Sequence, residues 1–297
     1  YLGLMRILIT GSNGLLGQKI VSQLLRSDSV FVATSLGENR NQDCPIEFYT
    51  PMDICNATEI ADVFAAFKPT HVIHTAAMTN VDTCELDPES CQKINVDSVQ
   101  LLAEQCIKSA CHLQLLSTDF VFDGLIGNYS EEDEPNPLSV YADSKVQGEA
   151  IVQQLPGLNF SIVRTIIVYG TGNNLSRSNI VLWAKEALMN GQELTIIDDQ
   201  FRAPTWADDL AWACIRICEL NEKGIFHIAG PETMSIFHLV ERIAKFYKLP
   251  MSQVKRTDSS TLNQPAKRPP KTGFNLSKAK SRLGYNPKKL EDTLDLL

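Results

Sequence analysis

The sequence predicts an α/β fold in which a doubly wound parallel sheet is followed by a smaller C-terminal α/β part. Two observations carry this prediction. Short, continuously apolar runs alternate with runs of 3.6-residue periodicity over the first 165 residues, and a glycine-rich turn directly follows the first apolar run. Continuous apolar strands that alternate with helices are typical of a parallel sheet buried on both faces, and right-handed crossovers wind such a sheet in both directions.

Each predicted element is bounded by turn signals or by the end of its apolar pattern. The strands predicted in the first half are Arg6–Thr10, Val30–Ser35, His71–Ala76 and Leu113–Ser117. The helices predicted between and after them are Leu15–Leu25, Ala57–Phe67, Ser90–Ser109 and Val140–Gln154. After residue 165 we expect helices at Ile180–Met189, Asp208–Leu220 and Ile236–Tyr247, and a loop at Ser259–Thr272. The chain therefore divides into an N-terminal domain, 1–165, and a smaller region, 166–297, which we expect to interleave with the first in space.

Composition and charge exclude several classes of protein. The 297 residues are 44% apolar and 21% charged, which is ordinary for a soluble globular protein, and no apolar run reaches the roughly 18 to 20 residues that cross a bilayer. The apolar start lacks a basic leader and a cleavage site, so we expect a first strand there and a cytoplasmic protein. The net charge of −8 argues against a nucleic-acid partner.

The cysteine and histidine patterns do not indicate a metal site or a disulfide framework. None of the eight cysteines forms a C-x-x-C pair, and the five histidines are not spaced to complete a zinc site. We therefore expect reduced thiols, mostly in the core, and no metal. The adjacent acids Asp198 and Asp199 leave Mg²⁺ at a subunit contact open, although two adjacent acids are usually solvated.

Positive charge gathers late in the chain. Residues 255–289 contain ten Lys or Arg and a single acid, Asp258. A basic segment on an acidic body suits a small anionic ligand bound near it, and a solvated basic face is the alternative interpretation.

A dinucleotide-binding turn follows the first predicted strand. Gly11, Gly14 and Gly17 lie in Thr-Gly-Ser-Asn-Gly-Leu-Leu-Gly, between that strand and the first helix. In such a turn the first glycine permits a tight bend, the second lets the backbone approach a pyrophosphate, and the third lets the helix pack on the strand. The phosphates would bind free N–H groups at the start of the helix, as in a Rossmann-type domain.

A candidate acid lies on the helix predicted at Val140–Gln154. Tyr141 and Lys145 are four residues apart and therefore share one face of that helix. A cation near a phenol favours the phenolate, so we expect Lys145 to lower the pKa of Tyr141 and make it a proton donor to a carbonyl that receives hydride. The hydroxyls of Ser117 and Thr118 end the preceding strand, at the sheet edge where catalytic residues of open α/β sheets lie.

In this order and spacing, the motifs resemble the extended short-chain dehydrogenase/reductases and, within them, the dTDP-4-dehydrorhamnose reductase family. The narrower resemblance rests on Ser-Thr-Asp-Phe-Val-Phe-Asp-Gly at 117–124, Tyr-x-x-x-Lys at 141–145 with Gly-Glu at 148–149, Val-Arg-Thr at 163–165, Val-Tyr-Gly at 168–170, Asp-Gln-Phe-Arg-Ala-Pro-Thr at 199–205 and Arg-Pro-Pro at 268–270. It covers almost the whole chain. Relatives of this family include the regulatory beta subunit of methionine adenosyltransferase, which keeps the fold and binds NADP(H).

The resemblance implies a set of site residues. Thr118, Tyr141 and Lys145 would be catalytic, with Thr118 bonding the substrate carbonyl and Lys145 also bonding the nicotinamide ribose. The implied cofactor-binding set is Gly11, Asn13, Gly14, Leu15, Leu16, Gly17, Ser35, Arg40, Asp53, Ile54, Ala76, Ala77, Met78, Tyr141 and Lys145. The implied substrate-binding set is Thr118, Asp119, Val121, Arg202 and Arg268.

Two positions depart from the family pattern, and two others bear on the cofactor. Ile167 stands where a tryptophan usually packs on the sugar, and Arg202 stands where a glycine is common. Arg202 would either contact a diphosphate in a bidentate manner or point to solvent, and both alternatives stay open. Ser35 ends the second strand where an NAD-selective site has an acid, and Arg40 follows it, so NADP(H) is favoured and NAD(H) is the alternative.

The sequence thus supports an enzyme hypothesis and a binding hypothesis. In the first, NADPH reduces the 4-keto group of a nucleotide-linked 6-deoxyhexose, as in the conversion of dTDP-4-dehydrorhamnose to dTDP-rhamnose; a different sugar-nucleotide reductase or an epimerase is a near alternative. In the second, the chain is a non-catalytic NADP-binding regulatory subunit that resembles the methionine adenosyltransferase beta subunit. The set Thr118, Tyr141 and Lys145 favours the enzyme. The expected partner is a nucleotide-sugar substrate, and a homodimer is compatible with the sequence. We expect no nucleic-acid partner and no membrane association.

Overall fold

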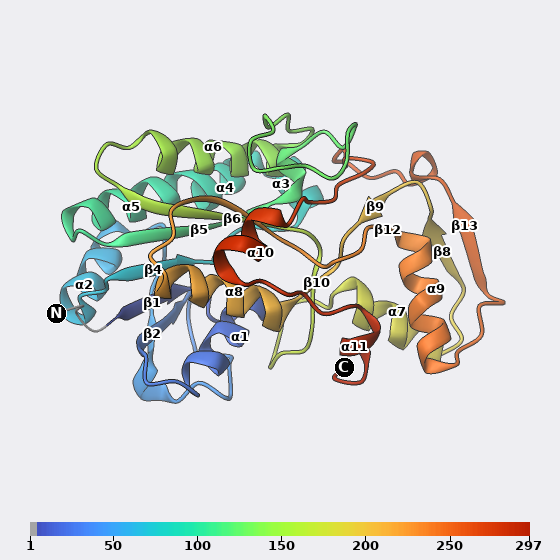
Figure 1. Cartoon of the computed structure of the whole chain (residues 1–297), viewed down its shortest axis with the longest axis horizontal. Helices are drawn as coiled ribbons and strands as arrows, with labels where there is room; N and C mark the ends of the chain where they lie inside the picture. The colour runs from blue at the N-terminus through green and yellow to red at the C-terminus, as the bar shows by residue number, and fades with distance from the viewer. Residues whose placement is uncertain (1–4) are drawn as a thin grey trace.

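A seven-stranded parallel sheet forms the centre of the molecule (Figure 1). The computed structural model describes residues 5–297, so the first four residues of the predicted N-terminal domain lie outside the described range. The strand order is β11-β6-β5-β4-β1-β2-β3. These strands are β1 (Arg6–Thr10), β2 (Val30–Ser35), β3 (Tyr49–Pro51), β4 (His71–His74), β5 (His112–Thr118), β6 (Asn159–Thr165) and β11 (Gly224–Ile228). The order runs outward in both directions from β1 and β4, which confirms a doubly wound sheet of the Rossmann type.

Helices cover both faces of this sheet (Figure 1). The helices on one face are α2 (Ala57–Phe67), α5 (Ser98–Lys108) and α6 (Val140–Gln154), and those on the other are α1 (Leu15–Leu24), α8 (Ala207–Glu219) and α10 (Ser277–Leu283). Neighbouring residues of β1 belong to opposite cores: Ile7 packs with Ile20 of α1, whereas Leu8 packs with Ile60 of α2. Burial on both faces explains why the strands are continuously apolar.

A smaller lobe lies at the carboxyl ends of the strands, on the right of Figure 1. It contains α7 (Ile180–Met189), α9 (Ile236–Tyr247) and the parallel pair β8 (Leu194–Ile197) and β13 (Val254–Thr257) around an apolar core of its own. Its remaining short elements are β7 (Val168–Tyr169), β9 (Phe201–Arg202), β10 (Thr205–Trp206), β12 (Met234–Ser235) and α11 (Glu291–Leu294). The region after residue 165 also supplies α8, α10 and β11 to the main sheet, so the chain passes between the two parts more than once.

Two predicted elements differ from the structure by more than one residue at an end. The strand predicted to end at Ala76 ends at His74, and the helix predicted at Ser90–Ser109 is divided into α4 (Pro88–Gln92), a π-helical turn at Lys93–Asp97 and α5. A further helix, α3 (Val81–Leu86), precedes them. The π-helical turn presents Asn95, whose side-chain oxygen and nitrogen bond the Met78 N–H and carbonyl at 2.8 and 2.9 Å. Asn95 thus fixes the backbone of the segment that follows β4, whereas the Thr75 N–H directly after the strand donates to the Thr10 carbonyl.

Among residues 5–297, no helix is long and apolar enough to cross a membrane. All eight cysteines are free thiols, and seven of them are buried. No group of three or more His, Cys, Asp or Glu side chains within 5–297 is arranged to hold a metal ion. Asp198 accepts hydrogen bonds from Ser235 and Arg256, and Asp199 accepts them from the N–H and the hydroxyl of Ser259, so both acids are engaged by protein groups.

Candidate active site

The glycine-rich turn lies between β1 and α1, and the fold itself requires two of its three glycines. Gly11 has a φ of +70°, and a Cβ there would lie 2.6 Å from the Ala76 nitrogen. A Cβ at Gly17 would lie 2.4 Å from the Gly11 carbonyl oxygen. At Gly14, which is exposed, the nearest atom would be 3.3 Å away. The missing side chain of Gly14 therefore leaves open space outside the turn, where a ligand could approach the backbone.

The start of α1 leaves backbone donors without a side-chain acceptor. No side-chain hydrogen bond caps this ten-residue helix, whose N-cap is Gly14, whereas Ser139 and Asn179 cap α6 and α7 with their side-chain oxygens. The first N–H groups of a helix need an outside acceptor, and the helix dipole favours a negatively charged one. The N–H groups of Leu15 and Leu16, next to the bare turn, therefore fit a pyrophosphate.

We expect Gly14→Val to weaken binding of the predicted cofactor NADPH by roughly 100-fold. Blocking two hydrogen bonds to a charged phosphate costs about 3 kcal/mol, and about 1.4 kcal/mol corresponds to tenfold in affinity. Stability should change little, because the 3.3 Å clearance lets a valine fit with a small shift. Calorimetric titration and urea unfolding measure the two effects.

Gly17→Ala is the matched contrast for that variant. Its Cβ would meet backbone atoms at 2.4 and 2.6 Å, so the free energy of unfolding should fall together with cofactor affinity. Normal NADPH binding by the Gly14 variant would show that the turn serves only the fold.

The loop after β2 places Arg40 beside the same turn. Asn13 holds this loop, because its amide nitrogen donates to the Glu38 carbonyl and its oxygen accepts from the Arg40 N–H, both at 2.8 Å. The side chain of Arg40 is exposed, and its guanidinium makes no hydrogen bond or ion pair within residues 5–297. Ser35, at the end of β2, is half-buried and carries no charge that would repel a phosphate. This end of the site can therefore accept an anion.

Arg40→Ala should weaken NADPH binding by roughly 10- to 150-fold and leave NADH binding nearly unchanged. Only NADPH carries the 2′-phosphate, and one charge-assisted hydrogen bond is worth about 1.5 to 3 kcal/mol. Parallel titrations with the two cofactors measure the difference. Arg26→Ala, an exposed arginine just beyond the far end of α1, controls for the loss of one positive charge. Equal losses for both cofactors would exclude Arg40 as the phosphate ligand.

The remaining predicted cofactor residues follow the ends of neighbouring strands. Residues 76–78 follow β4 and are half-buried, with Met78 fixed by Asn95. Asp53 and Ile54 follow β3 and are also half-buried. These positions form one edge with the glycine turn, because the carboxyl ends of parallel strands lie side by side.

The three predicted catalytic residues occupy the carboxyl end of β5 and the helix that packs on it. Thr118 is the last residue of β5, and Tyr141 and Lys145 lie in the first two turns of α6. All three are buried, with exposed fractions of 8, 8 and 5%. The Tyr141 ring stands edge-on to Phe120, with ring centroids 6.2 Å apart. The phenol and the ammonium are thus both held inside the protein, on the same helix.

The effect of the surroundings on Tyr141 is opposite to the expected one. Burial raises the pKa of the Tyr141 phenol above its ordinary value, and the Thr118 hydroxyl and the Arg177 charge lower it by less. Burial also lowers the pKa of Lys145 to about 8, and the neighbouring Glu149 carboxylate opposes this. Desolvation therefore outweighs any charge effect, and Tyr141 carries its proton at neutral pH.

A buried ionic network supports α6, the helix of Tyr141 and Lys145. Glu149, one turn after Lys145, accepts a hydrogen bond from Ser117 Oγ at 2.6 Å and bonds from Arg164 Nε and Nη2 at 2.9 and 2.6 Å. Glu149 and Arg164 are each 1% exposed. The Arg164 guanidinium also lies over the Phe122 ring, 5.1 Å from its centroid. The network ties α6 to β5 and β6. The Ser117 hydroxyl is used for the hydrogen bond to Glu149 and is therefore not free to bind a ligand.

Two of the predicted substrate residues lie deeper than expected. Val121 is fully buried in the core beside α1 and α8, so its side chain does not face a ligand in this structure. Arg202 is 2% exposed and does not point to solvent. Its Nη atoms donate to the Phe201 carbonyl at 2.7 Å and the Pro269 carbonyl at 2.6 Å, and Nε lies 3.8 Å from Asp119 Oδ2. In this structure the Arg202 guanidinium is therefore used for hydrogen bonds to backbone carbonyls, including that of Pro269.

Asp119 and Arg268 are each tied to a distant segment. Asp119 accepts hydrogen bonds from the Thr118 hydroxyl at 3.1 Å and from the Thr272 hydroxyl. Nη1 and Nη2 of Arg268 donate to the two carboxylate oxygens of Asp82 at 3.1 and 2.7 Å. Sequence reasoning missed Asp82 and Thr272, and no short motif marks them, because their partners are 186 and 153 residues away.

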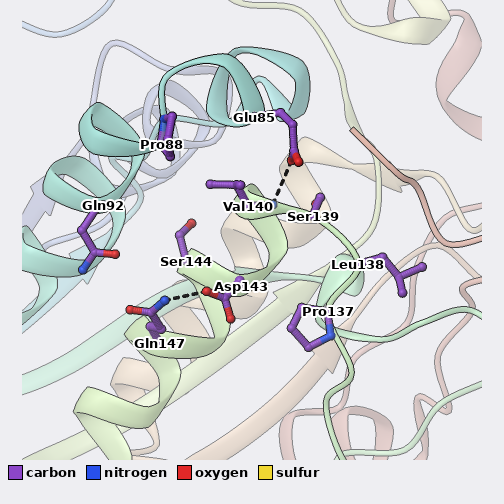
Figure 2. A pocket seen from close by; sticks show the side chains of 10 residues that line it. All are labelled: Glu85, Pro88, Gln92, Pro137, Leu138, Ser139, Val140, Asp143, Ser144 and Gln147. Atoms are coloured by element: carbon purple, nitrogen blue, oxygen red, sulfur yellow. Dashed lines mark hydrogen bonds between the residues drawn. The ribbon is translucent and has the colours of Figure 1, made fainter. Parts of the chain in front are cut away.

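A separate cavity of about 530 Å³ lies beside α6 (Figure 2). It is lined by Glu85, Pro88, Gln92, Pro137, Leu138, Ser139, Val140, Asp143, Ser144 and Gln147. Glu85 accepts from the Val140 N–H at 3.0 Å, and Gln147 donates to Asp143 at 2.6 Å. None of the predicted catalytic or cofactor residues lines this cavity, so it lies apart from the predicted site.

The chain is similar to one family of proteins over its described length. A family model described as "RmlD substrate binding domain" matches residues 5–297. The dTDP-4-dehydrorhamnose reductase of Aggregatibacter actinomycetemcomitans is 31% identical over 298 residues, which cover 95% of this chain and 94% of that protein. A crystal structure of a dTDP-4-dehydrorhamnose reductase from Clostridium acetobutylicum is 30% identical with a TM-score of 0.85, and the match covers 98% of this chain and 97% of that one. Methionine adenosyltransferase 2 subunit beta of Danio rerio is 29% identical over 255 residues, 84% of this chain and 76% of that protein.

Proposed function

The chain belongs to the RmlD substrate-binding-domain family, and from this premise we propose that it uses NADPH to reduce the 4-keto group of a nucleotide-linked 6-deoxyhexose. The proposed reaction is of the type that converts dTDP-4-dehydrorhamnose to dTDP-rhamnose. The observation that carries the proposal is the grouping of Thr118, Tyr141 and Lys145 at the carboxyl edge of the sheet, the same edge that holds the glycine turn. NADH is the alternative cofactor.

The groups proposed to bind the cofactor phosphates are backbone N–H groups and a guanidinium that have no acceptor in the described protein. NADPH supplies a hydride when it is bound. The turn at Gly14 and the first N–H groups of α1 bind the pyrophosphate, and Arg40 pairs with the 2′-phosphate. Lys145 bonds the nicotinamide ribose and places its charge beside the phenol of Tyr141.

Tyr141 supplies the proton to the carbonyl oxygen, which gains negative charge when the carbonyl carbon receives the hydride. Because burial raises its pKa, the phenol holds its proton until the carbonyl oxygen gains negative charge. The Lys145 charge then stabilises the phenolate that is left, in a site from which water is largely excluded. Thr118 orients the carbonyl; its hydroxyl donates to Asp119 in this structure, so a substrate oxygen takes over that hydrogen bond.

An NADPH-oxidation assay with a panel of 4-keto nucleotide sugars tests the proposed reaction. We expect turnover with at least one 4-keto-6-deoxyhexose linked to a nucleoside diphosphate, and no oxidation when the sugar is already reduced. The relatives named methionine adenosyltransferase 2 subunit beta support the second candidate, a regulatory subunit. Tight NADPH binding without turnover of any sugar in the panel would favour that candidate.

A further inference from the structure

A short segment runs across the rim of the proposed site from the C-terminal region. We call residues 266–272 the strap. Its near end is bonded to Asp82, its middle to Arg202 and its far end to Asp119. Asp82 lies at the start of α3, and Asp119 directly follows the catalytic Thr118. The strap is therefore held at three points by charged side chains around the catalytic residues.

The near end of the strap presents the donors that bind a phosphate. The Ala266 N–H and both Nη atoms of Arg268 converge on the Asp82 carboxylate, at 3.2, 3.1 and 2.7 Å. A forked guanidinium together with a backbone N–H is a common donor set for phosphate groups. The Asp82 carboxylate offers two oxygens in the same geometry but only one negative charge.

This contact lies next to the catalytic cluster and within reach of solvent. Val81, the neighbour of Asp82, packs in the apolar cluster that contains Tyr141. Arg177, whose charge lowers the pKa of Tyr141, donates to Thr79 Oγ at 2.7 Å, three residues before Asp82. The side chains of Arg268 and Asp82 are 15 and 32% exposed. An incoming anion can therefore reach the pair from outside.

We propose that Asp82 is an intramolecular competitor that occupies the diphosphate subsite of Arg268 until a nucleoside diphosphate displaces it. The proposal rests on the proposed function and adds to it that Arg268, one of the expected substrate-binding residues, binds the substrate's diphosphate. A diphosphate carries more negative charge than one carboxylate and brings its own nucleoside contacts, so it can replace Asp82. Asp82 thus lowers the affinity for every ligand of Arg268 and leaves the site to ligands that bind strongly enough to displace it.

The test is calorimetric titration of the NADP⁺-bound chain with dTDP and, separately, with inorganic pyrophosphate. Asp82→Asn keeps the shape of the side chain and removes its charge, so dTDP should bind roughly three- to tenfold more tightly. Asp82→Ala carries the same expectation and provides a second variant if the first folds poorly. Arg268→Gln should weaken dTDP binding and cancel the gain from Asp82→Asn in the double variant. Asp62→Asn, an exposed acid on α2, controls for the change in net charge.

Weaker or unchanged dTDP binding in both Asp82 variants would overturn the proposal, because Asp82 would then position Arg268 instead of competing for it. Neutral thymidine should bind the wild type and Asp82→Asn equally, and an equal gain for thymidine would also count against competition at a phosphate site. The titration needs no turnover. A chain that reduces no keto sugar but binds dTDP more tightly after Asp82→Asn would refute the proposed reaction and retain the competitor.

Discussion

Tyr141→Phe is expected to lower kcat for the keto sugar by about two to four orders of magnitude, the usual effect of removing a positioned proton donor. The substitution removes one hydroxyl and keeps the ring that stands edge-on to Phe120. The start of α6, capped by Ser139, is untouched. NADPH affinity should change little, because its proposed contacts lie mainly in the glycine turn and the strand ends. Steady-state kinetics and a cofactor titration measure the two quantities.

Lys145→Met is the comparison that separates proton donation from cofactor binding. It removes both the charge beside the phenol and the proposed ribose contact, so kcat and NADPH affinity should fall together. Methionine is a long, unbranched side chain, so it fills most of the buried space that Lys145 occupies. Near-native turnover by Tyr141→Phe on the preferred sugar would rule out the mechanism. Equal loss of cofactor binding in both variants would instead show that the Tyr141 hydroxyl contributes as much to NADPH binding as Lys145 does.

Local sequence patterns were sufficient for the elements that position the site. β1, β2, α2 and α6 have the predicted bounds, because apolar runs buried on both faces and clear turn signals leave few alternatives. The grouping of the glycine turn with Thr118, Tyr141 and Lys145 followed from the rule that strand ends of a parallel sheet share one edge. The exception was the pKa of Tyr141, since a sequence shows that a cation is near but not how deeply the phenol is buried.

The contacts between distant loops could not be predicted in the same way. Arg202 places a long, charged side chain where the family commonly has glycine. From the sequence alone, this side chain was expected either to contact a diphosphate or to point to solvent. Its observed acceptors include the Pro269 carbonyl, 67 residues later, which only the folded loop brings near. Asp82 lies in a short helix that no apolar pattern marked, and its partner Arg268 is 186 residues away. Such pairs form only in the folded chain. They determine which of the predicted binding residues already have a protein partner.

Glu149→Leu is expected to destabilise the fold by about 3 to 5 kcal/mol, because it leaves the guanidinium of Arg164 buried without its counter-ion. Arg164 and Glu149 are joined at 2.6 Å with side chains only 2% exposed. Adding Arg164→Met should recover much of the loss, since the unpaired charge is then absent. Urea unfolding measures both effects. Glu219→Gln, which breaks an exposed pair with Arg216 at 2.9 Å, should cost less than about 1 kcal/mol. A similar cost for Glu149→Leu and Glu219→Gln would mean that the buried network contributes little to stability.

The double variant also shows whether Glu149 acts on catalysis through Lys145. Burial lowers the pKa of Lys145 to about 8, and the Glu149 charge works against that lowering. In the wild type, the Lys145 charge and the NADPH affinity that depends on it should therefore decrease as the pH rises through about 8. Without Glu149 the pKa of Lys145 falls further, so the same decrease should begin at lower pH, and Lys145→Met should lack it. NADPH titrations from neutral to alkaline pH compare the three chains. If NADPH affinity depends on pH in the same way in the double variant as in the wild type, the Glu149 charge does not act on Lys145. Glu149 would then act only on the stability of the fold, through its ion pair with Arg164.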